Sequence, residues 1–314
     1  MKYAALSYST KNIGDEIQTI AAKKFLPTID YFVDRDDLKN AQLAEQTKII
    51  LNGWFLGQPN NWPPNEKFDP LFISFHVTHK NSCRNYFSQK TFLNYIKNYE
   101  PIGCRDISTL NFLKSLGIEC YFSGCLTLTL ENPSLIRNDK IYFVDPIHNI
   151  PMEEMKRLIS RIVPKHLQGE VEIISHWDNR IIPDTPMSKL SFAEQLLKKY
   201  ATAKLVITSR LHCALPCIAF NTPVYFMDIG YNALDDRNRF EGLLNFVETI
   251  KCEEYFIANN FLLKTLSNLF PLNDIVNFEK IRKQIDWQLQ VIEKAGLHQI
   301  KDVLNKNVTE FLVK

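Results

Sequence analysis

The sequence predicts an α/β protein of two domains, each built on a mostly parallel sheet. Short apolar runs alternate with segments of helical periodicity along its 314 residues, and such alternation produces βαβ units. The alternation breaks near residues 132–134 (Asn-Pro-Ser), and the length allows two separate cores. We therefore expect an N-terminal domain at residues 1–132, a second domain at 138–275 and a C-terminal helical segment at 276–314.

The first domain should open with a strand at residues 3–7 and a helix at residues 14–25. Apolar residues of this helix share one face, and Asp15 and Glu16 suit its first turn, where the helix dipole favours negative charge. A later helix, whose apolar pattern includes Leu110, Leu113 and Leu116, should end at Gly117. Further strands are expected from composition at residues 29–33, 48–52 and 71–75.

The second domain should repeat the alternation. Its strands are expected at residues 140–144, 171–175, 205–207 and 224–227, and its helices at 152–163, 192–200 and from 211 onward. One or two amphipathic helices should follow, with Ile281, Ile285, Trp287, Leu289 and Ile292 packed against the body or an interface. Their charged face is expected to be solvated, and a membrane-facing patch is the open alternative.

Residues 204–212 (Lys-Leu-Val-Ile-Thr-Ser-Arg-Leu-His) predict an anion site. A short apolar strand ends just before Arg210 and His212, and a helix begins there. Ligands of open α/β sheets bind at the carboxyl ends of strands, and a helix N-terminus favours phosphate or carboxylate. The alternative is that Arg210 pairs with a structural carboxylate and His212 is a satisfied buried histidine.

Residues 103–110 (Gly-Cys-Arg-Asp-Ile-Ser-Thr-Leu) form a second strand, charged turn and helix start. Asp106 or Ser108 can cap that helix. Arg105 needs another explanation, because a cation near a helix N-terminus opposes the dipole. An anion bound between Arg105 and Arg210 would provide one.

Other polar residues follow expected strands. Gly53 would allow close backbone approach, and Trp54 offers a face on which a sugar can stack, although a turn with a half-buried tryptophan is equally compatible. His76 and the pair at residues 176–177 (His-Trp) also end strands. The charged loop at residues 235–240 either closes over a cleft or is a solvated turn.

Three ordered blocks give the chain a family resemblance. They are residues 12–16 (Asn-Ile-Gly-Asp-Glu), residues 105–108 (Arg-Asp-Ile-Ser) and residues 209–212 (Ser-Arg-Leu-His). With them the chain resembles the polysaccharide pyruvyl transferases over most of residues 1–230. The resemblance implies two Rossmann-like domains facing each other across a cleft, a GT-B-type arrangement with the acceptor side in the first domain and the donor side in the second.

The resemblance also implies a reaction. Family members transfer the enolpyruvyl group of phosphoenolpyruvate onto a sugar of a polysaccharide or its precursor, where it closes to a ketal and phosphate leaves. Arg105, Arg210 and His212 match the donor-binding positions. The arginines would hold phosphate and carboxylate, and His212 would act as acid or base, with the choice left open. The scheme needs no metal and no cofactor besides the donor substrate.

The chain departs from the family after the strand that follows the Arg105 helix. Members often carry Asp-Pro there, whereas this chain has Ser123-Gly124, which indicates a different sugar or a different donor. The expected catalytic residues are thus His212, Arg210 and Arg105. The expected substrate-binding residues are Asn12, Gly14, Asp15, Asn52, Gly53, Trp54, His76, Ser123, Gly124, Ser209 and Leu211.

Two other functions stay open. A glycosyltransferase could use the same cleft and arginine pair to hold the diphosphate of a nucleotide sugar. A non-catalytic glycan-binding or anion-binding protein could keep the fold. The expected partner is a sugar or a lipid-linked oligosaccharide acceptor, and the sequence does not predict an oligomeric state.

Bulk properties limit the location and partners. The 37 basic and 35 acidic residues give a net charge of +2, unlike the basic excess of nucleic-acid-binding proteins. The seven cysteines form no Cys-x-x-Cys pair and suit a reducing compartment. Without a signal peptide or a long apolar run, we expect a cytoplasmic protein, with peripheral association at the inner face of the membrane left open.

Overall fold

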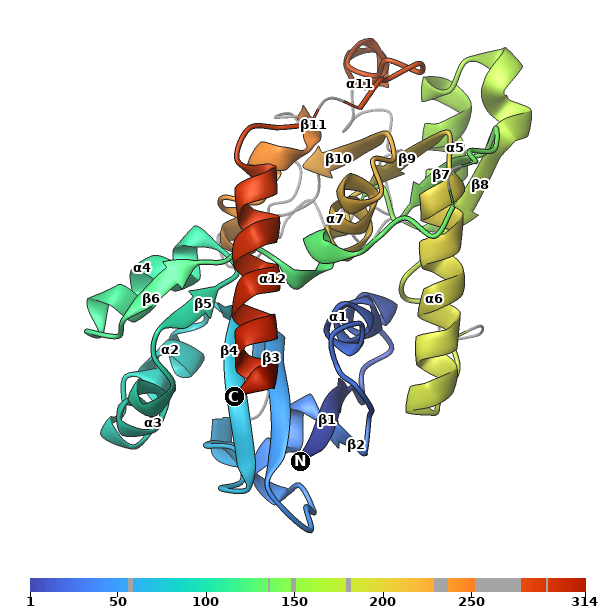
Figure 1. The fold of residues 1–314 in the computed structure, drawn as a ribbon. Helices are drawn as coiled ribbons and strands as arrows, with labels where there is room; N and C mark the ends of the chain where they lie inside the picture. Colours follow the sequence, from blue (N-terminus) through green and yellow to red (C-terminus); the bar gives the residue numbers. More distant parts are fainter. Residues whose placement is uncertain are drawn as a thin grey trace.

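The computed structural model describes residues 1–55, 59–134, 136–147, 151–178, 182–228, 237–251, 278–291 and 293–314. It contains two sheets in which every described strand pair is parallel (Figure 1). The predicted α/β class with mostly parallel sheets is therefore confirmed.

The six-stranded first sheet has the order β2-β1-β3-β4-β5-β6. Its strands are β1 (Lys2–Ser7), β2 (Tyr31–Asp34), β3 (Thr47–Phe55), β4 (Phe68–Val77), β5 (Ile102–Cys104) and β6 (Cys120–Phe122). The five-stranded second sheet has the order β11-β10-β9-β7-β8. Its strands are β7 (Ile141–Val144), β8 (Val171–Ile174), β9 (Leu205–Thr208), β10 (Val224–Asp228) and β11 (Glu248–Lys251).

The described helices cover the sheets and connect their strands. They are α1 (Ile13–Lys23), α2 (Asn81–Phe87), α3 (Lys90–Ile96), α4 (Ile107–Ser115), α5 (Met152–Ile162), α6 (Pro186–Thr202), α7 (Leu211–Ala219), α11 (Phe278–Lys283) and α12 (Leu297–Val313). Short 3₁₀ helices lie at Arg35–Asn40, Pro59–Asn61, Lys97–Tyr99, Leu126–Thr129, Lys165–Glu170, Asn238–Phe240 and Leu244–Phe246.

Helix α1 joins the two halves. Its buried face, with Ile13, Ile17 and Ala21, belongs to one apolar cluster together with Leu196 of α6 and Ala214 of α7. In Figure 1, α1 lies between the first sheet and these two helices. The N-terminus of α1 is thereby held next to the loop that follows β8, where Ile13 N donates to the carbonyl of His176.

The C-terminal helix returns to the first sheet. Helix α12 runs from the region of β11 to β3 and β4 (Figure 1), and Lys48 Nζ donates to the carbonyl of Phe311 at 2.6 Å. Ile300 of α12 lies so close to Gly124 that a Cβ atom on residue 124 would be 2.9 Å from Ile300 Cγ2. Gly124, which has φ +67°, is therefore a packing position for α12.

The C-terminal segment, where one or two amphipathic helices were expected, contains two described helices. Helix α11 ends at Lys283, and α12 begins after Gly296, whose φ is +84°. Trp287 and Leu289 lie in the connection, where they pack against the apolar cluster under the second sheet. Ile292 lies outside the described residues.

Helix α6 begins at Pro186, six residues before the expected start at 192. The Thr185 side chain accepts a hydrogen bond from Ser188 N, and Pro186 occupies the first turn. Proline suits that place because the first N–H groups of a helix have no partner within it. The sequence Pro-Asp-Thr-Pro therefore starts a helix here.

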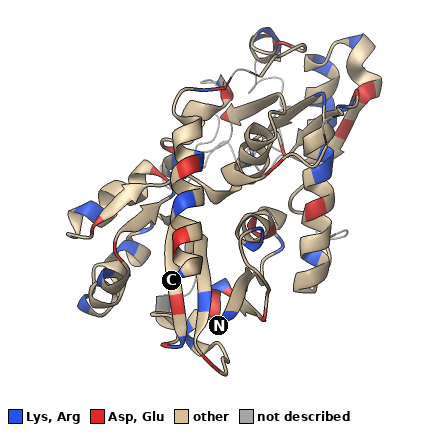
Figure 2. Ribbon diagram, viewed as in Figure 1, with Lys and Arg blue, Asp and Glu red and all other residues tan. Residues whose placement is uncertain are grey.

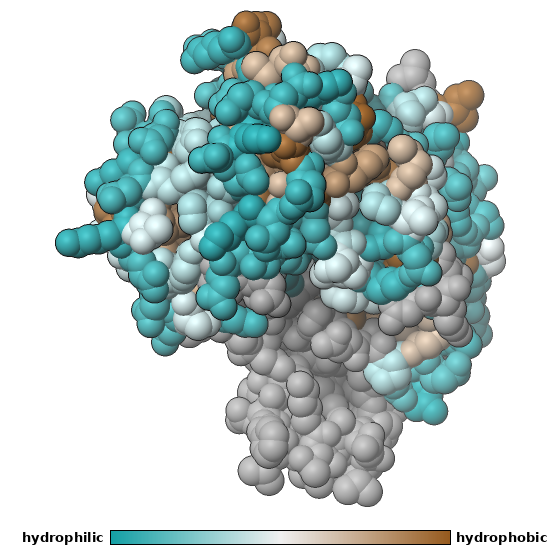
Figure 3. All heavy atoms as spheres, turned by 90° about the horizontal axis from the view of Figure 1, so that it is seen from below, coloured by the Kyte–Doolittle hydropathy of each residue, from teal (hydrophilic) through white to brown (hydrophobic). Residues whose placement is uncertain are grey.

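Charge and polarity vary over the surface. Basic and acidic residues alternate along α6 and α12 (Figure 2). On the face shown in Figure 3, hydrophilic residues predominate and hydrophobic residues are scattered. Within the part of the chain that the structure describes, no helix has the length and apolarity to cross a membrane.

The strand orders determine where a ligand can bind. The first sheet reverses its winding between β1 and β3, and the second between β7 and β9. At such switch points the loops leave in opposite directions and open a crevice at the carboxyl ends of the strands.

Candidate active site

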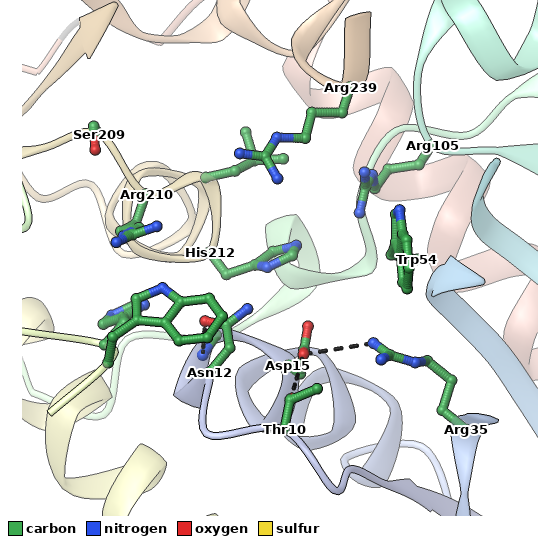
Figure 4. Close-up of a pocket in the computed structure, with 14 residues that line it drawn as sticks. Thr10, Asn12, Asp15, Arg35, Trp54, Arg105, Ser209, Arg210, His212 and Arg239 are labelled. Carbon is green, nitrogen blue, oxygen red and sulfur yellow. Dashed lines mark hydrogen bonds and ion pairs between the residues drawn. The ribbon is translucent and has the colours of Figure 1, made fainter. Parts of the chain in front are cut away.

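A pocket of about 270 Å³ lies at the carboxyl ends of strands from both sheets (Figure 4). Loops after β1, β2 and β5 contribute to it from the first sheet, and loops after β8 and β9 from the second. The lining residues are Thr10, Asn12, Gly14, Asp15, Arg35, Trp54, Arg105, His176, Trp177, Ser209, Arg210, Leu211, His212 and Arg239.

The N-terminus of α1 forms one wall. Asn12 caps the helix, with its side-chain oxygen accepting from Gly14 N at 3.2 Å. A Cβ on Gly14 would lie 3.4 Å from both His176 Nδ1 and His212 Cβ. Because Ile13 N donates to the carbonyl of His176 at 3.1 Å, glycine lets the helix start directly against the second half.

Asp15 lies in a polar network beside Trp54. Its carboxylate accepts from Thr10 Oγ1 at 3.1 Å and is 3.5 Å from the guanidinium of Arg35. Arg35 is buried, yet it also pairs with Asp36 at 2.9 Å and lies 5.3 Å from the centre of the Trp54 ring. This side of the pocket therefore combines an aromatic face with hydrogen-bonding groups.

Arg105 enters from the end of β5 and is only 2% exposed. Of the two possible caps for α4, Asp106 is used, since its carboxylate accepts from Thr109 N at 2.9 Å. The same carboxylate is 3.6 Å from Arg105 Nε, which makes no hydrogen bond within the described residues. Burial lowers the pKa of Arg105, and Arg239 adds to that effect.

His76 lies behind Arg105 and does not line the pocket. Its Nδ1 is 2.6 Å from Asp106. Burial lowers the pKa of His76 to about 4 although Asp106 opposes the shift, so neutral His76 donates Nδ1–H to the carboxylate. This contact fixes Asp106, and through it the surroundings of Arg105.

Arg210 enters from the end of β9 and is paired. Its Nε donates to Asp145 at 2.9 Å, and its guanidinium lies 5.8 Å from the centre of the Trp177 ring. The structural pairing considered for Arg210 is therefore present, and Arg210 lines the pocket as well.

Asp145 is the organising residue that sequence reasoning missed. Its carboxylate also accepts from His176 N at 2.9 Å, and its carbonyl accepts from Ser209 Oγ at 2.6 Å. One residue thus connects the ends of β7, β8 and β9. Its position directly after an apolar strand, before Pro146, was the available signal.

His212 lies in the first turn of α7, and its imidazole is at the centre of Figure 4. Its Nε2 is buried and has no hydrogen-bond partner among the described residues. Burial, and after it the charge of Arg105, lower the pKa of His212 well below its usual range. The ring is therefore neutral at pH 7, and Nε2 can interact with a ligand.

Arg239, on a 3₁₀ helix, completes the cationic lining. It extends with Arg105 toward the space beside the His212 ring (Figure 4) and contributes to lowering the imidazole pKa. It belongs to the charged loop noted in the sequence, of which Asp235 and Asp236 lie outside the described residues. The lining thus holds Arg35, Arg105, Arg210 and Arg239 against one carboxylate, Asp15.

Asn52, Gly53, His76, Ser123 and Gly124, all expected to bind substrate, do not line this pocket. Asn52 Nδ2 donates to the carbonyl of Gln18 at 2.9 Å. Gly53 has φ +120°, and a Cβ there would lie 2.9 Å from the Gln18 side chain. Both residues therefore fit β3 against α1.

Ser123 is fully buried between strands. Its hydroxyl accepts from Ser74 N at 3.0 Å and lies 3.1 Å from the carbonyl of Cys104. It therefore links β4 and β5 at the edge of the sheet that is distant from the switch point.

Within the described ranges, no group of three or more His, Cys, Asp or Glu side chains is placed to hold a metal ion.

The family model of the polysaccharide pyruvyl transferases matches residues 12–231. A solved structure of a functionally uncharacterised protein from Klebsiella pneumoniae subsp. pneumoniae NTUH-K2044 is 14% identical, with a TM-score of 0.41, over 76% of this chain and 87% of that chain. A search of curated proteins found no match.

Proposed function

This chain belongs to the polysaccharide pyruvyl transferase family, and we propose that it transfers the enolpyruvyl group of phosphoenolpyruvate onto a sugar of a polysaccharide or its precursor. The product is a pyruvate ketal, and inorganic phosphate is released. The observation that carries the proposal is the lining of four arginines and one carboxylate around His212 Nε2, which has no hydrogen-bond partner in the described part of the chain.

The charges of the pocket suit this donor. Phosphoenolpyruvate carries a phosphate and a carboxylate, and guanidinium groups bind both with charge-assisted hydrogen bonds. Arg105 and Arg210 come from different sheets, so one donor can contact both halves. We keep the expectation of two Rossmann-like domains facing across a GT-B-type cleft, which a pocket lined from both sheets supports.

The chemistry requires one proton at C3 of the donor and the removal of another from the acceptor hydroxyl. The hydroxyl oxygen forms a bond to C2, the C2–C3 π pair takes the proton, and phosphate leaves with the C2–O pair. A second hydroxyl then closes the ketal and loses its proton. A bound anion would offset the cations that keep His212 neutral, so donor binding should raise its pKa and make it the acid.

The acceptor is assigned to the α1 side of the pocket. Trp54 provides a stacking face, and Asn12, Asp15 and Thr10 provide the donors and acceptors that sugar hydroxyls need. Ser209 and Leu211 lie on the donor side, at the start of α7. A lipid-linked oligosaccharide and a free glycan end would present the same chemistry here.

A ligand panel tests the proposal. We expect phosphoenolpyruvate alone to stabilise the protein against heat, by about 2.7 kcal/mol at one hundred times its Kd. The glycosyltransferase alternative, which gains no support from the comparisons, predicts stabilisation by nucleotide sugars alone, and a binding protein predicts stabilisation by glycans alone. Either of these results would overturn pyruvyl transfer.

A further inference from the structure

Helix α7 carries a proline at an unusual place. Pro216 lies inside the helix, and the residue four positions earlier is His212. In a regular helix the amide of residue 216 would donate a hydrogen bond to the carbonyl of His212. Proline has no N–H to donate, and its ring collides with that carbonyl and displaces it. The helical hydrogen bond from the amide of residue 216 to the His212 carbonyl therefore cannot form.

The backbone departs from the helix at the same residue. His212 has φ −81° and ψ 17°, outside helical values. The carbonyl of Arg210 accepts from both Cys213 N and Ala214 N, each at 3.0 Å, a shared pattern typical of a tightened helix end. The irregularity thus coincides with the residue whose carbonyl Pro216 leaves without its usual donor.

Packing confines the irregularity to the first turn. Cys213, Ala214, Leu215 and Cys217 are fully buried in the cluster that α7 shares with α1 and α6, so the helix body has no room to tilt. On the other side, Gly14 leaves space for the Cβ of His212. The departure from helical geometry is therefore located at the His212 peptide.

We propose that Pro216 is a positioning residue, which turns the His212 imidazole into the pocket by denying the His212 carbonyl its helical hydrogen bond. The assignment deepens the proposed function, because it concerns the group that would protonate the donor. It also explains a proline in a helix interior, where it is otherwise unfavourable.

Pro216→Ala tests this directly, with Pro186→Ala as the matched control. Pro186 occupies the exposed first turn of α6, where alanine restores no missing hydrogen bond. In Pro216→Ala we expect the new amide of residue 216 to be protected from hydrogen exchange and the imidazole ¹⁵N shifts of His212 to change. Conversion of phosphoenolpyruvate should fall at least tenfold, while the melting temperature stays equal or rises.

Unchanged ¹⁵N shifts of His212 in Pro216→Ala would overturn the proposal, whatever the melting temperature. The two NMR readouts require no donor, so they separate this assignment from the reaction. If the shifts change but the wild-type protein neither binds nor converts phosphoenolpyruvate, the positioning role stands and the proposed function fails.

Discussion

Replacing Arg105 by alanine should separate donor binding from fold stability. Arg105 is nearly inaccessible and its Nε makes no hydrogen bond among the described residues, while Arg239 is a nearby like charge that disfavours its ionisation. When no anion is bound, this guanidinium therefore contributes little to the stability of the fold. A bound phosphate or carboxylate would gain charge-assisted hydrogen bonds worth about 2–3 kcal/mol, so Kd should rise about 30- to 150-fold.

The assay is calorimetric titration of phosphoenolpyruvate, with urea unfolding of the same preparations. Arg105→Lys should recover only part of the affinity, because an ammonium cannot form the planar paired contact. Arg157→Ala is the control, since Arg157 is exposed and pairs only with Glu154 on its own helix among the contacts described. An Arg105→Ala protein that binds the donor like wild type but unfolds more easily would refute the reasoning.

Two further substitutions test positions outside the chemistry. Burial raises the pKa of Glu16 from 4.5 to about 7 although Lys189 opposes the shift. The folded protein therefore favours the protonated carboxyl, and the free energy of unfolding should fall as the pH rises from about 4.5 through 7. Glu16→Gln should remove this pH-dependent fall, which is on the order of 3 kcal/mol and which urea unfolding at about pH 5 and about pH 8 measures. Gly124→Ala should destabilise the fold by about 1–3 kcal/mol through the contact with Ile300 and leave donor affinity unchanged; weaker donor binding at unchanged stability would assign Gly124 to the site.

Regular alternation made most strands and helices of the fold predictable. Helices α2 and α3 were missed because each spans only seven residues and neither has a side-chain cap. Strand β11 was missed because its four residues, Glu-Thr-Ile-Lys, place a single fully buried side chain in the sheet. Such short elements are set by tertiary packing rather than by local pattern.

The candidate site was predictable where its residues directly follow the end of a strand. Arg105, Arg210 and His212 each follow a parallel strand, and they lie in one pocket because the carboxyl ends of strands from both sheets meet there. The same argument selected Ser123, which does not line this pocket, since strand order, and hence the switch point, is not visible in local sequence. Arg35 was missed because it lies in a charged run, Asp-Arg-Asp-Asp, and its ring contacts are with Tyr8 and Trp54, which are distant in sequence.

The most direct measurement is a proton NMR record of phosphoenolpyruvate incubated with the protein and a set of methyl hexopyranosides. The account predicts that the vinyl signals are replaced by a ketal methyl signal as phosphate appears. Folded His212→Gln, with an unchanged melting temperature, should react more slowly than wild type by about 100-fold or more. Intact phosphoenolpyruvate alongside cleavage of a nucleotide sugar, or a His212→Gln protein as fast as wild type, would contradict it.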